Sequence, residues 1–432
     1  MVGRPGAQVI LFDLADAMKT DSWGVQRKKR DYIEVWVFLL LLFSVNFFDL
    51  LPITRVIGPN GPFTFYLISL FLVFTFHRRA WIGDSIRWLT PFWWYLLGIL
   101  LSYVPSLLYY GQSFAQSFFT NRRIFEFTAF PILIALRPTE RELRTALYSF
   151  SVVYLFMTLF VTFFARTWVF LPPEASFIEE GDYVHNLSGV RHVSLAFIFA
   201  FQRMIKDSTR SNIAWTIFLF AILFLVQNRT SLIAVIFISG FVIYSMKMSA
   251  RKLIIIAIII VTLVLMAVYT SGQWGQLYQM TVSQIVNPEY NRNKALAYMF
   301  STRTPLRYLL GDGFISANVS PIIATLQESG IYHSDVGLVG LWHMYGVIPT
   351  AVILVMTIKA LSRKKSFAVR AAAIYVLTGT LTLSFFAFGE TLLWLSIFLY
   401  MYYVDGDPAY VDNRVTKRHF TWTTWRYRSI GG

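Results

Sequence analysis

Long apolar runs recur along almost the whole of this chain, and they constrain its fold more than any other feature. A helix needs about 17 to 25 residues to cross roughly 30 Å of hydrocarbon. Every crossing must be helical, because an open strand edge leaves backbone groups without hydrogen bonds in lipid. The runs therefore predict an all-α polytopic membrane protein with about twelve transmembrane helices, at residues 33–48, 63–76, 91–109, 124–136, 143–164, 190–204, 213–226, 231–246, 253–269, 336–358, 369–388 and 391–404.

The composition excludes several other classes of protein. Of the 432 residues, 56% are hydrophobic and only 14% are charged, and the mean hydropathy is +0.55. Soluble domains usually carry about a quarter charged residues. These values exclude a disordered chain, a fibrous repeat and an ordinary cytosolic enzyme. The chain has no cysteine, so it contains neither a disulfide nor a thiolate metal site.

The distribution of the basic residues orients the predicted helices. The formal net charge is +15, and 28 of the 38 lysines and arginines fall in every second connection and in the two terminal segments. Because cytoplasmic loops carry an excess of basic residues, both termini are expected to be cytoplasmic. This assigns residues 1–32 and 405–432 to cytoplasmic segments and 33–404 to the transmembrane domain, with outer loops at 166–189 and 271–335. A topological role for the charge leaves no reason to expect nucleic acid as a partner.

Ten basic residues remain on the outer side, and nine of them are arginine. Arginine binds phosphate oxygens through two parallel hydrogen bonds, and charged groups beside spans often have functional roles. We therefore expect an anionic ligand at the outer leaflet, with a lipid-linked phosphate or diphosphate as the best fit. The alternative is that these side chains reach the interface or pair with acidic residues, for which Glu126 and Glu390 are candidates. The ten are Arg55, Arg122, Arg123, Arg166, Arg191, Arg229, Arg292, Lys294, Arg303 and Arg307.

The histidines offer a candidate general base. His333 stands two residues before Asp335 at the end of the second outer loop, and histidine titrates near neutral pH. A lone histidine is more often structural, and His343, inside the following span, is interpreted as a packing residue. In the same loop, residues 295–300 and 322–326 read as short helices and 311–313 as a turn. The sequence has no Walker loop, dinucleotide fingerprint or metal-spaced histidine cluster, so no cofactor is expected.

Three local patterns resemble the bacterial O-antigen ligase and polymerase family. The first is Asn-Arg-Thr-Ser-Leu-Ile-Ala at 228–234, where a span begins. The second is Arg-Asn-Lys-Ala-Leu-Ala-Tyr at 292–298, followed by Gly-Asp-Gly-Phe at 311–314. The third is His-Ser-Asp at 333–335, which runs into a glycine-bearing span with Tyr-Gly at 345–346. The resemblance covers residues 211–358 well and the first half of the chain only in topology.

This resemblance implies a membrane glycosyltransferase with a C-type helical fold, located in the bacterial inner membrane with its active site facing the periplasm. It implies that Arg229, Arg292 and His333 are catalytic, without nucleotide or metal. The arginines would stabilise charge on a departing undecaprenyl diphosphate, and His333 would accept the proton of the attacking sugar hydroxyl. The residues expected to bind substrate are Arg191, Arg122, Arg123, Arg303 and Asp335.

The expected function is polymerisation of lipid-linked polysaccharide repeat units. The growing glycan would pass from undecaprenyl diphosphate to a sugar hydroxyl of an incoming lipid-linked unit. One alternative is an O-antigen ligase that transfers finished polymer to lipid A core. A different class of alternative is a flippase or transporter for lipid-linked oligosaccharides. The expected partners are the glycan donor, the glycan acceptor, the lipid bilayer and a chain-length regulator.

Overall fold

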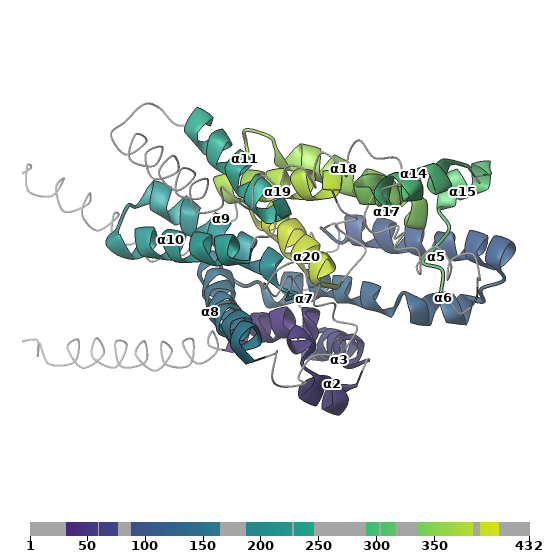
Figure 1. Ribbon diagram of the computed structural model, residues 1–432, viewed down its shortest axis with the longest axis horizontal. Helices are drawn as coiled ribbons and strands as arrows, with labels where there is room; N and C mark the ends of the chain where they lie inside the picture. The colour runs from purple at the N-terminus through teal and green to yellow at the C-terminus, as the bar shows by residue number, and fades with distance from the viewer. Residues whose placement is uncertain are drawn as a thin grey trace, which may run out of the picture.

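A computed structural model describes residues 32–58, 60–76, 88–164, 187–226, 229–245, 291–301, 304–316, 319, 336–382 and 389–405. Within these residues the secondary structure is helical and contains no β-strand, as the apolar runs predict. A first helix spans Tyr32–Ser44. It is followed by η1 (Asn46–Asp49), α2 (Leu51–Ile57), α3 (Gly61–Phe76), α5 (Thr90–Tyr110), α6 (Phe114–Thr120), η3 (Arg122–Thr128), α7 (Ala129–Leu136), α8 (Glu140–Phe164), α9 (Val190–Lys206), α10 (Arg210–Leu225), α11 (Arg229–Ser245), α14 (Asn291–Ser301), α15 (Pro305–Leu310), α17 (Gly337–Tyr345), α18 (Val347–Ala360), α19 (Phe367–Thr382) and α20 (Gly389–Val404) (Figure 1).

Two of these helices are long and apolar enough to cross a bilayer by themselves, at Thr90–Tyr110 and Glu140–Val161. Seven shorter apolar helices accompany them in the described residues. The predicted span at 253–269 and the predicted short helix at 322–326 lie outside the described residues. The count of about twelve spans therefore stays a prediction.

Several predicted spans are interrupted where the sequence pattern suggests a continuous helix. The segment at 336–358 is broken at Gly346, whose φ of +79° ends α17 before α18 begins. The segment at 124–136 starts as the 3₁₀ helix η3 and continues as the eight-residue α7. The first helix ends near Ser44, because Asn46, Phe47 and Phe48 all have positive φ. Hydropathy detects apolar length but carries no information about these backbone breaks.

Large apolar side chains cover the outside of many helices. On α3, for example, Phe71 is 69% exposed, and on α8 Phe163 is 70% exposed. Trp93 and Trp94 of α5 are both at least half exposed. Proteins in water rarely expose large contiguous apolar patches, and where they do, the patch marks contact with a membrane or with another protein.

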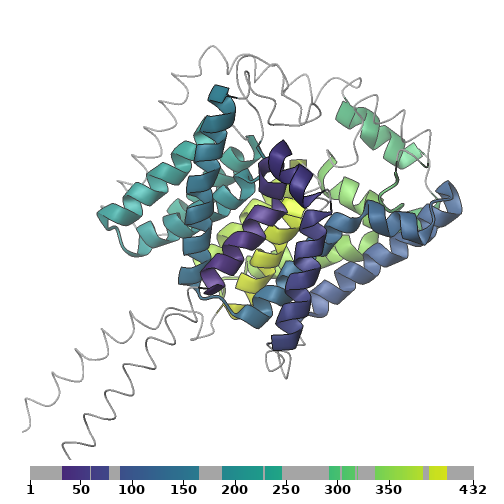
Figure 2. The same cartoon turned by 90° about the horizontal axis from the view of Figure 1, so that it is seen from below.

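The helix α20 lies near the middle of the bundle in both views, in yellow (Figures 1 and 2). Its side chains from Leu392 to Met401 are buried, and it contacts α7, η3, α9 and α19. The largest is Trp394, which is fully buried and stacks on Tyr375 of α19 with 5.1 Å between the ring centroids. The chain reaches this central element last, so the packing that fixes it joins parts of the sequence hundreds of residues apart.

One end of the bundle gathers several helix termini and their basic residues. The Tyr400 hydroxyl of α20 donates to the Pro138 carbonyl between α7 and α8, at 2.7 Å. Near the start of α8, Glu140 accepts from Arg203 at the end of α9, at 3.3 Å. Between α18 and α19, the Ser366 amide donates to Asp405, just after α20, at 2.9 Å. These are the ends that the charge pattern assigns to the cytoplasm.

Candidate functional site

The opposite end of the bundle holds Arg191, one of the predicted substrate-binding residues, at the start of α9. Its backbone amide donates to Glu390 Oε1 at 3.1 Å, and its guanidinium Nη1 lies 3.9 Å from Glu390 Oε2. Glu390 belongs to the first turn of α20. The expectation that Glu390 pairs with one of these arginines is confirmed, and the outer placement of Arg191 stays a prediction.

A chain of contacts ties the start of α11 to the same place. The Ser231 hydroxyl and the Tyr375 hydroxyl of α19 share a hydrogen bond of 2.9 Å. Tyr375 stacks on Trp394, whose indole N–H donates to the Arg191 carbonyl at 3.2 Å. Arg229 is the first residue of α11, two positions before Ser231; its side chain lies outside the described residues. The helix starts that carry Arg191 and Arg229 are therefore connected through α19 and α20.

The 3₁₀ helix η3 carries two more of the predicted residues, Arg122 and Arg123. Arg122 donates to the Phe119 carbonyl at 3.0 Å, which holds its guanidinium on its own loop. Arg123 is exposed and is the opposite charge that acts on Glu126. Runs of 3₁₀ helix longer than three or four residues are uncommon, and η3 has seven. It packs on both α20 and α3.

Glu126 is the second acidic residue expected to balance the arginines. It is only 2% exposed, and its Oε2 has no hydrogen-bond partner. Arg123 and Glu390 are the charged groups that act on it most strongly. Arg123, Arg191, Glu126 and Glu390 thus form a cluster of two basic and two acidic residues.

The motif residues of the second outer loop fall on a different set of helices. Arg292 is the second residue of α14, and its side chain lies outside the described residues. Ala295 and Met299 of α14 pack with Val336, the residue directly after Asp335, in a small hydrophobic cluster. His333, Asp335 and Arg303 themselves lie outside the described residues. The structure thus brings the helix that opens with Arg292 against the point where the His-Ser-Asp motif ends.

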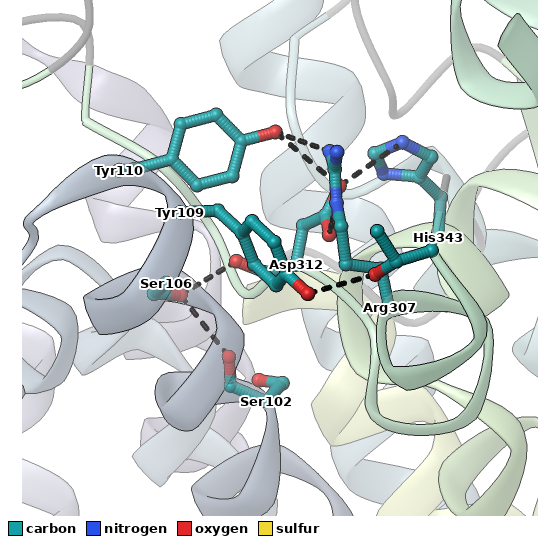
Figure 3. A network of polar contacts seen from close by, with 8 residues as sticks. Ser102, Ser106, Tyr109, Tyr110, Arg307, Asp312 and His343 are labelled. Atoms are coloured by element: carbon teal, nitrogen blue, oxygen red, sulfur yellow. Dashed lines mark hydrogen bonds and ion pairs between the residues drawn. The ribbon is translucent and has the colours of Figure 1, made fainter. Parts of the chain in front are cut away.

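A buried polar network lies between these motif helices and α5 (Figure 3). Arg307 of α15 forms a bidentate ion pair with Asp312, with Nε–Oδ1 and Nη2–Oδ2 distances of 2.7 Å each. Arg307 Nη2 also donates to the Tyr110 hydroxyl at 2.6 Å, and His343 Nε2 of α17 lies 3.4 Å from Asp312 Oδ2. Hydrogen bonding to Asp312 raises the pKa of Arg307 above its ordinary value, so Arg307 keeps its charge despite being 7% exposed.

Backbone contacts lock Asp312 in place. Its amide donates to the His343 carbonyl at 2.8 Å, and the Gly313 amide donates to the Met344 carbonyl at 2.7 Å. The Ser106 hydroxyl of α5 donates to the Asp312 carbonyl at 2.5 Å. The loop at 311–313 therefore satisfies carbonyls that the end of α17 leaves without helical partners.

Sequence reasoning only partly identified this network. Arg307 appeared among the outer basic residues, Asp312 only as part of a turn, and His343 as a packing residue. The sequence signal for the network is the position of Arg307, five residues before Asp312, which itself stands between two glycines. That spacing alone does not show that α5 and α17 complete the network.

Among the residues that the structure describes, no group of three or more histidine, aspartate or glutamate side chains could hold a metal ion. Comparisons with known proteins add no assignment: no protein-family model matches the chain, and a search of the curated proteins finds no match.

Proposed function

We propose that this protein is a membrane glycosyltransferase that polymerises lipid-linked polysaccharide repeat units at the periplasmic face of the bacterial inner membrane. The growing glycan passes from undecaprenyl diphosphate to a sugar hydroxyl of an incoming unit. The carbon–oxygen bond to the diphosphate breaks as the new glycosidic bond forms. Arginines stabilise the charge that the diphosphate gains in the transition state, and His333 accepts the hydroxyl proton.

The proposal rests on the contacts that connect the N-terminus of α9, which carries Arg191, to the N-terminus of α11, which carries Arg229. These arginines are 38 positions apart in the sequence. Nevertheless, Ser231, Tyr375 and Trp394 connect the two helix starts through direct contacts. Helix N-termini also favour anions, because their first amide groups lack helical acceptors, and at α9 the Arg191 amide already donates to one anion, the Glu390 carboxylate. Two arginine-bearing helix starts at one place suit a phosphate-rich leaving group.

A twelve-span arrangement with cytoplasmic termini is the second part of the proposal. It is supported by apolar side chains on the outside of the helices and by the gathering of basic helix termini at one end. The positive-inside rule places basic residues at the cytoplasmic ends of apolar spans, so the basic end of the bundle is assigned to the cytoplasm. The predicted arginines Arg191 and Arg229 lie at the opposite helix ends.

The proposal is tested by incubating the purified protein in detergent with a lipid-diphosphate repeat unit, with and without lipid A core, and analysing the glycan products. A glycan ladder from the lipid-linked unit alone supports the polymerase. Product that forms only with core supports the ligase instead. No product under either condition contradicts both enzymes and favours a flippase or transporter, since moving a lipid across a bilayer makes no new bond.

The residues are tested by Arg229→Ala and Arg292→Ala, which should leave membrane insertion intact and abolish chain extension. Arg363→Ala is the matched control, because Arg363 is exposed in the connection between α18 and α19, at the basic end. Polysaccharide of normal length from Arg229→Ala or Arg292→Ala would contradict the mechanism. For His333→Ala we expect a severe loss of extension.

A further inference from the structure

Residues 304–316 pack into the break between α17 and α18, although the hydropathy pattern assigns them to an outer loop. The Asp312 amide donates to the carbonyl of His343, in the last turn of α17, at 2.8 Å. A Cβ on Gly311 would lie 2.5 Å from the nitrogen of Gly346, where α17 ends. The tip of this loop therefore fills the place where the predicted span is interrupted.

The other side of the loop packs on α5 and on the residue that follows its C-cap. The Ser106 hydroxyl of α5 donates to the Asp312 carbonyl at 2.5 Å (Figure 3). The buried side chain of Gln112 donates to the Phe314 carbonyl at 3.1 Å and accepts from the Ser316 amide at 2.8 Å. Irregular backbone at membrane depth is tolerated only where protein or water satisfies its polar groups. These bonds provide such partners along the loop.

Two helices give the depth of this contact in the membrane. Under the proposed topology, Thr90 of α5 and Ala360 of α18 lie at the cytoplasmic ends of their helices. At 1.5 Å per residue, Ser106 lies about 24 Å along α5 from Thr90, and Gly346 lies about 21 Å along α18 from Ala360. Both lengths fall short of the roughly 30 Å of hydrocarbon. Tilted helices rise less than their length, so the loop tip lies inside the hydrocarbon, toward its outer side.

The charges of this segment are turned away from its surface. Its two charged side chains, Arg307 and Asp312, are both buried and are paired with each other at 2.7 Å. The exposed side of α15 instead carries Leu306 and Leu309. A charged side chain that faces lipid is costly. An apolar exposed face with the charges paired inside is therefore the arrangement that hydrocarbon favours.

The exposed apolar surface of α5 extends to the beginning of α15. Leu97 and Leu108 are both exposed, and a spacing of eleven residues places them on one face of α5. Tyr109, next to Leu108, shares a hydrogen bond of 2.9 Å between its hydroxyl and that of Thr304, the residue before α15. Since α5 is long and apolar enough to cross a bilayer by itself, this continuity favours lipid as the occupant of the α15 face.

We propose that residues 304–316 form a re-entrant element, a segment that enters the hydrocarbon and leaves it on the same side, and that the Leu306 and Leu309 face of α15 contacts lipid acyl chains. This inference rests on the membrane arrangement in the proposed function and not on its chemistry. It differs from the expectation that residues 271–335 are an aqueous outer loop. The lipid-contact surface thus extends beyond the spans that hydropathy detects.

Because the chain has no cysteine, a nitroxide spin label can be attached at one engineered cysteine in the full chain, reconstituted in liposomes. Leu309→Cys is the test position, at 55% exposure, and Leu100→Cys of α5, at 54%, is the matched lipid control. Ser113→Cys and Ser362→Cys, both exposed in connections between helices, are the water controls. Molecular oxygen concentrates in hydrocarbon and a nickel chelate stays in water, so collisions of the label with each report its surroundings.

The ratio of oxygen to nickel collisions should be several-fold higher at Leu309→Cys than at either serine position, and close to that at Leu100→Cys. Nickel collisions as frequent as at Ser113→Cys would mean that α15 lies in water, and would overturn the inference. Few collisions with both reagents would mean that protein covers the face, from this chain or a second copy, and would overturn it too.

The measurement needs no enzyme activity, so the two proposals fail separately. A protein that makes no glycan but shows lipid contact at Leu309→Cys rejects the proposed function and keeps the re-entrant element. Glycan synthesis with water contact at this position does the reverse. If labelled Leu309→Cys does not fold, Leu306→Cys replaces it on the same face of α15, and water contact or protein cover there overturns the inference in the same way.

Discussion

Replacing Gly311 with alanine should destabilise the protein more than the same change at Gly111. Both glycines have positive φ, +78° at Gly311 and +67° at Gly111, so the pair forms a matched comparison. They differ in their surroundings. A Cβ on Gly111 would meet nothing within 4 Å, whereas a Cβ on Gly311 would lie 2.5 Å from the Gly346 nitrogen and the Met344 oxygen.

The magnitude follows from the backbone geometry. Gly111 has a left-handed helical conformation, which costs alanine about 1–2 kcal/mol. Gly311 combines its φ with a ψ of 175°, a region essentially limited to glycine that costs about 1–3 kcal/mol. The added methyl group would also push the loop away from α17 and break the hydrogen bonds of Asp312 and Gly313 to it. Each is worth about 0.5–1.5 kcal/mol, so Gly311→Ala should cost about 2–6 kcal/mol in total.

Thermal unfolding of the detergent-solubilised protein, followed by tryptophan fluorescence, measures the difference. Gly311→Ala should melt clearly below Gly111→Ala. Gly346→Ala should behave like Gly311→Ala, because its Cβ would lie 2.4 Å from the Leu309 oxygen. Equal melting temperatures for Gly311→Ala and Gly111→Ala would refute the idea that close backbone packing holds this loop.

Three further outcomes are expected. In intact cells, an impermeant thiol reagent should label Ser113→Cys, which is exposed between α5 and α6, but should label Ser362→Cys, which is also exposed, only after permeabilisation. The reverse labelling pattern would contradict the proposed topology. Gly98→Ala should destabilise by about 1–3 kcal/mol through overpacking, because its Cβ would lie 2.3 Å from Pro349 Cδ, while Gly240→Ala, with nothing within 4 Å, should cost nothing. Tyr375→Phe should lower stability by about 1 kcal/mol through loss of a buried hydrogen bond to Ser231; an unchanged melting temperature would contradict the role given to that bond.

The apolar runs predict much of the helical architecture, because positions that are buried and positions that contact lipid both favour apolar residues. They fail where a single residue changes the backbone direction. A glycine within an apolar run, such as Gly346, can allow close helix packing or can end a helix, and the structure shows that Gly346 ends α17. The choice between these roles depends on Gly311, which is 35 positions earlier and has no detectable pattern linking it to Gly346.

The candidate site shows the same division. A counter-ion role for Glu390 could be inferred, because a carboxylate at a helix start on the side of the arginines has few other partners. Its pairing with Arg191 depends on α9 and α20 lying side by side. The Asp312 network was missed for a related reason. A turn residue is recognised from its glycine neighbours, but its burial is decided by α5 and α17, which the local sequence does not describe.

The break at Gly346 has a consequence for how the chain enters its membrane. Under the proposed topology the His343 and Met344 carbonyls lie in hydrocarbon, where they have no water to bind, and their hydrogen bonds come from the amides of Asp312 and Gly313. The donors are synthesised some thirty residues before the acceptors, so the loop has already left the ribosome when this segment reaches the insertion machinery. The segment at 336–358 should therefore insert poorly when expressed alone and efficiently when residues 304–316 precede it. Membrane insertion of this span would then depend on residues 304–316, which the hydropathy pattern assigns to an outer loop and not to a span.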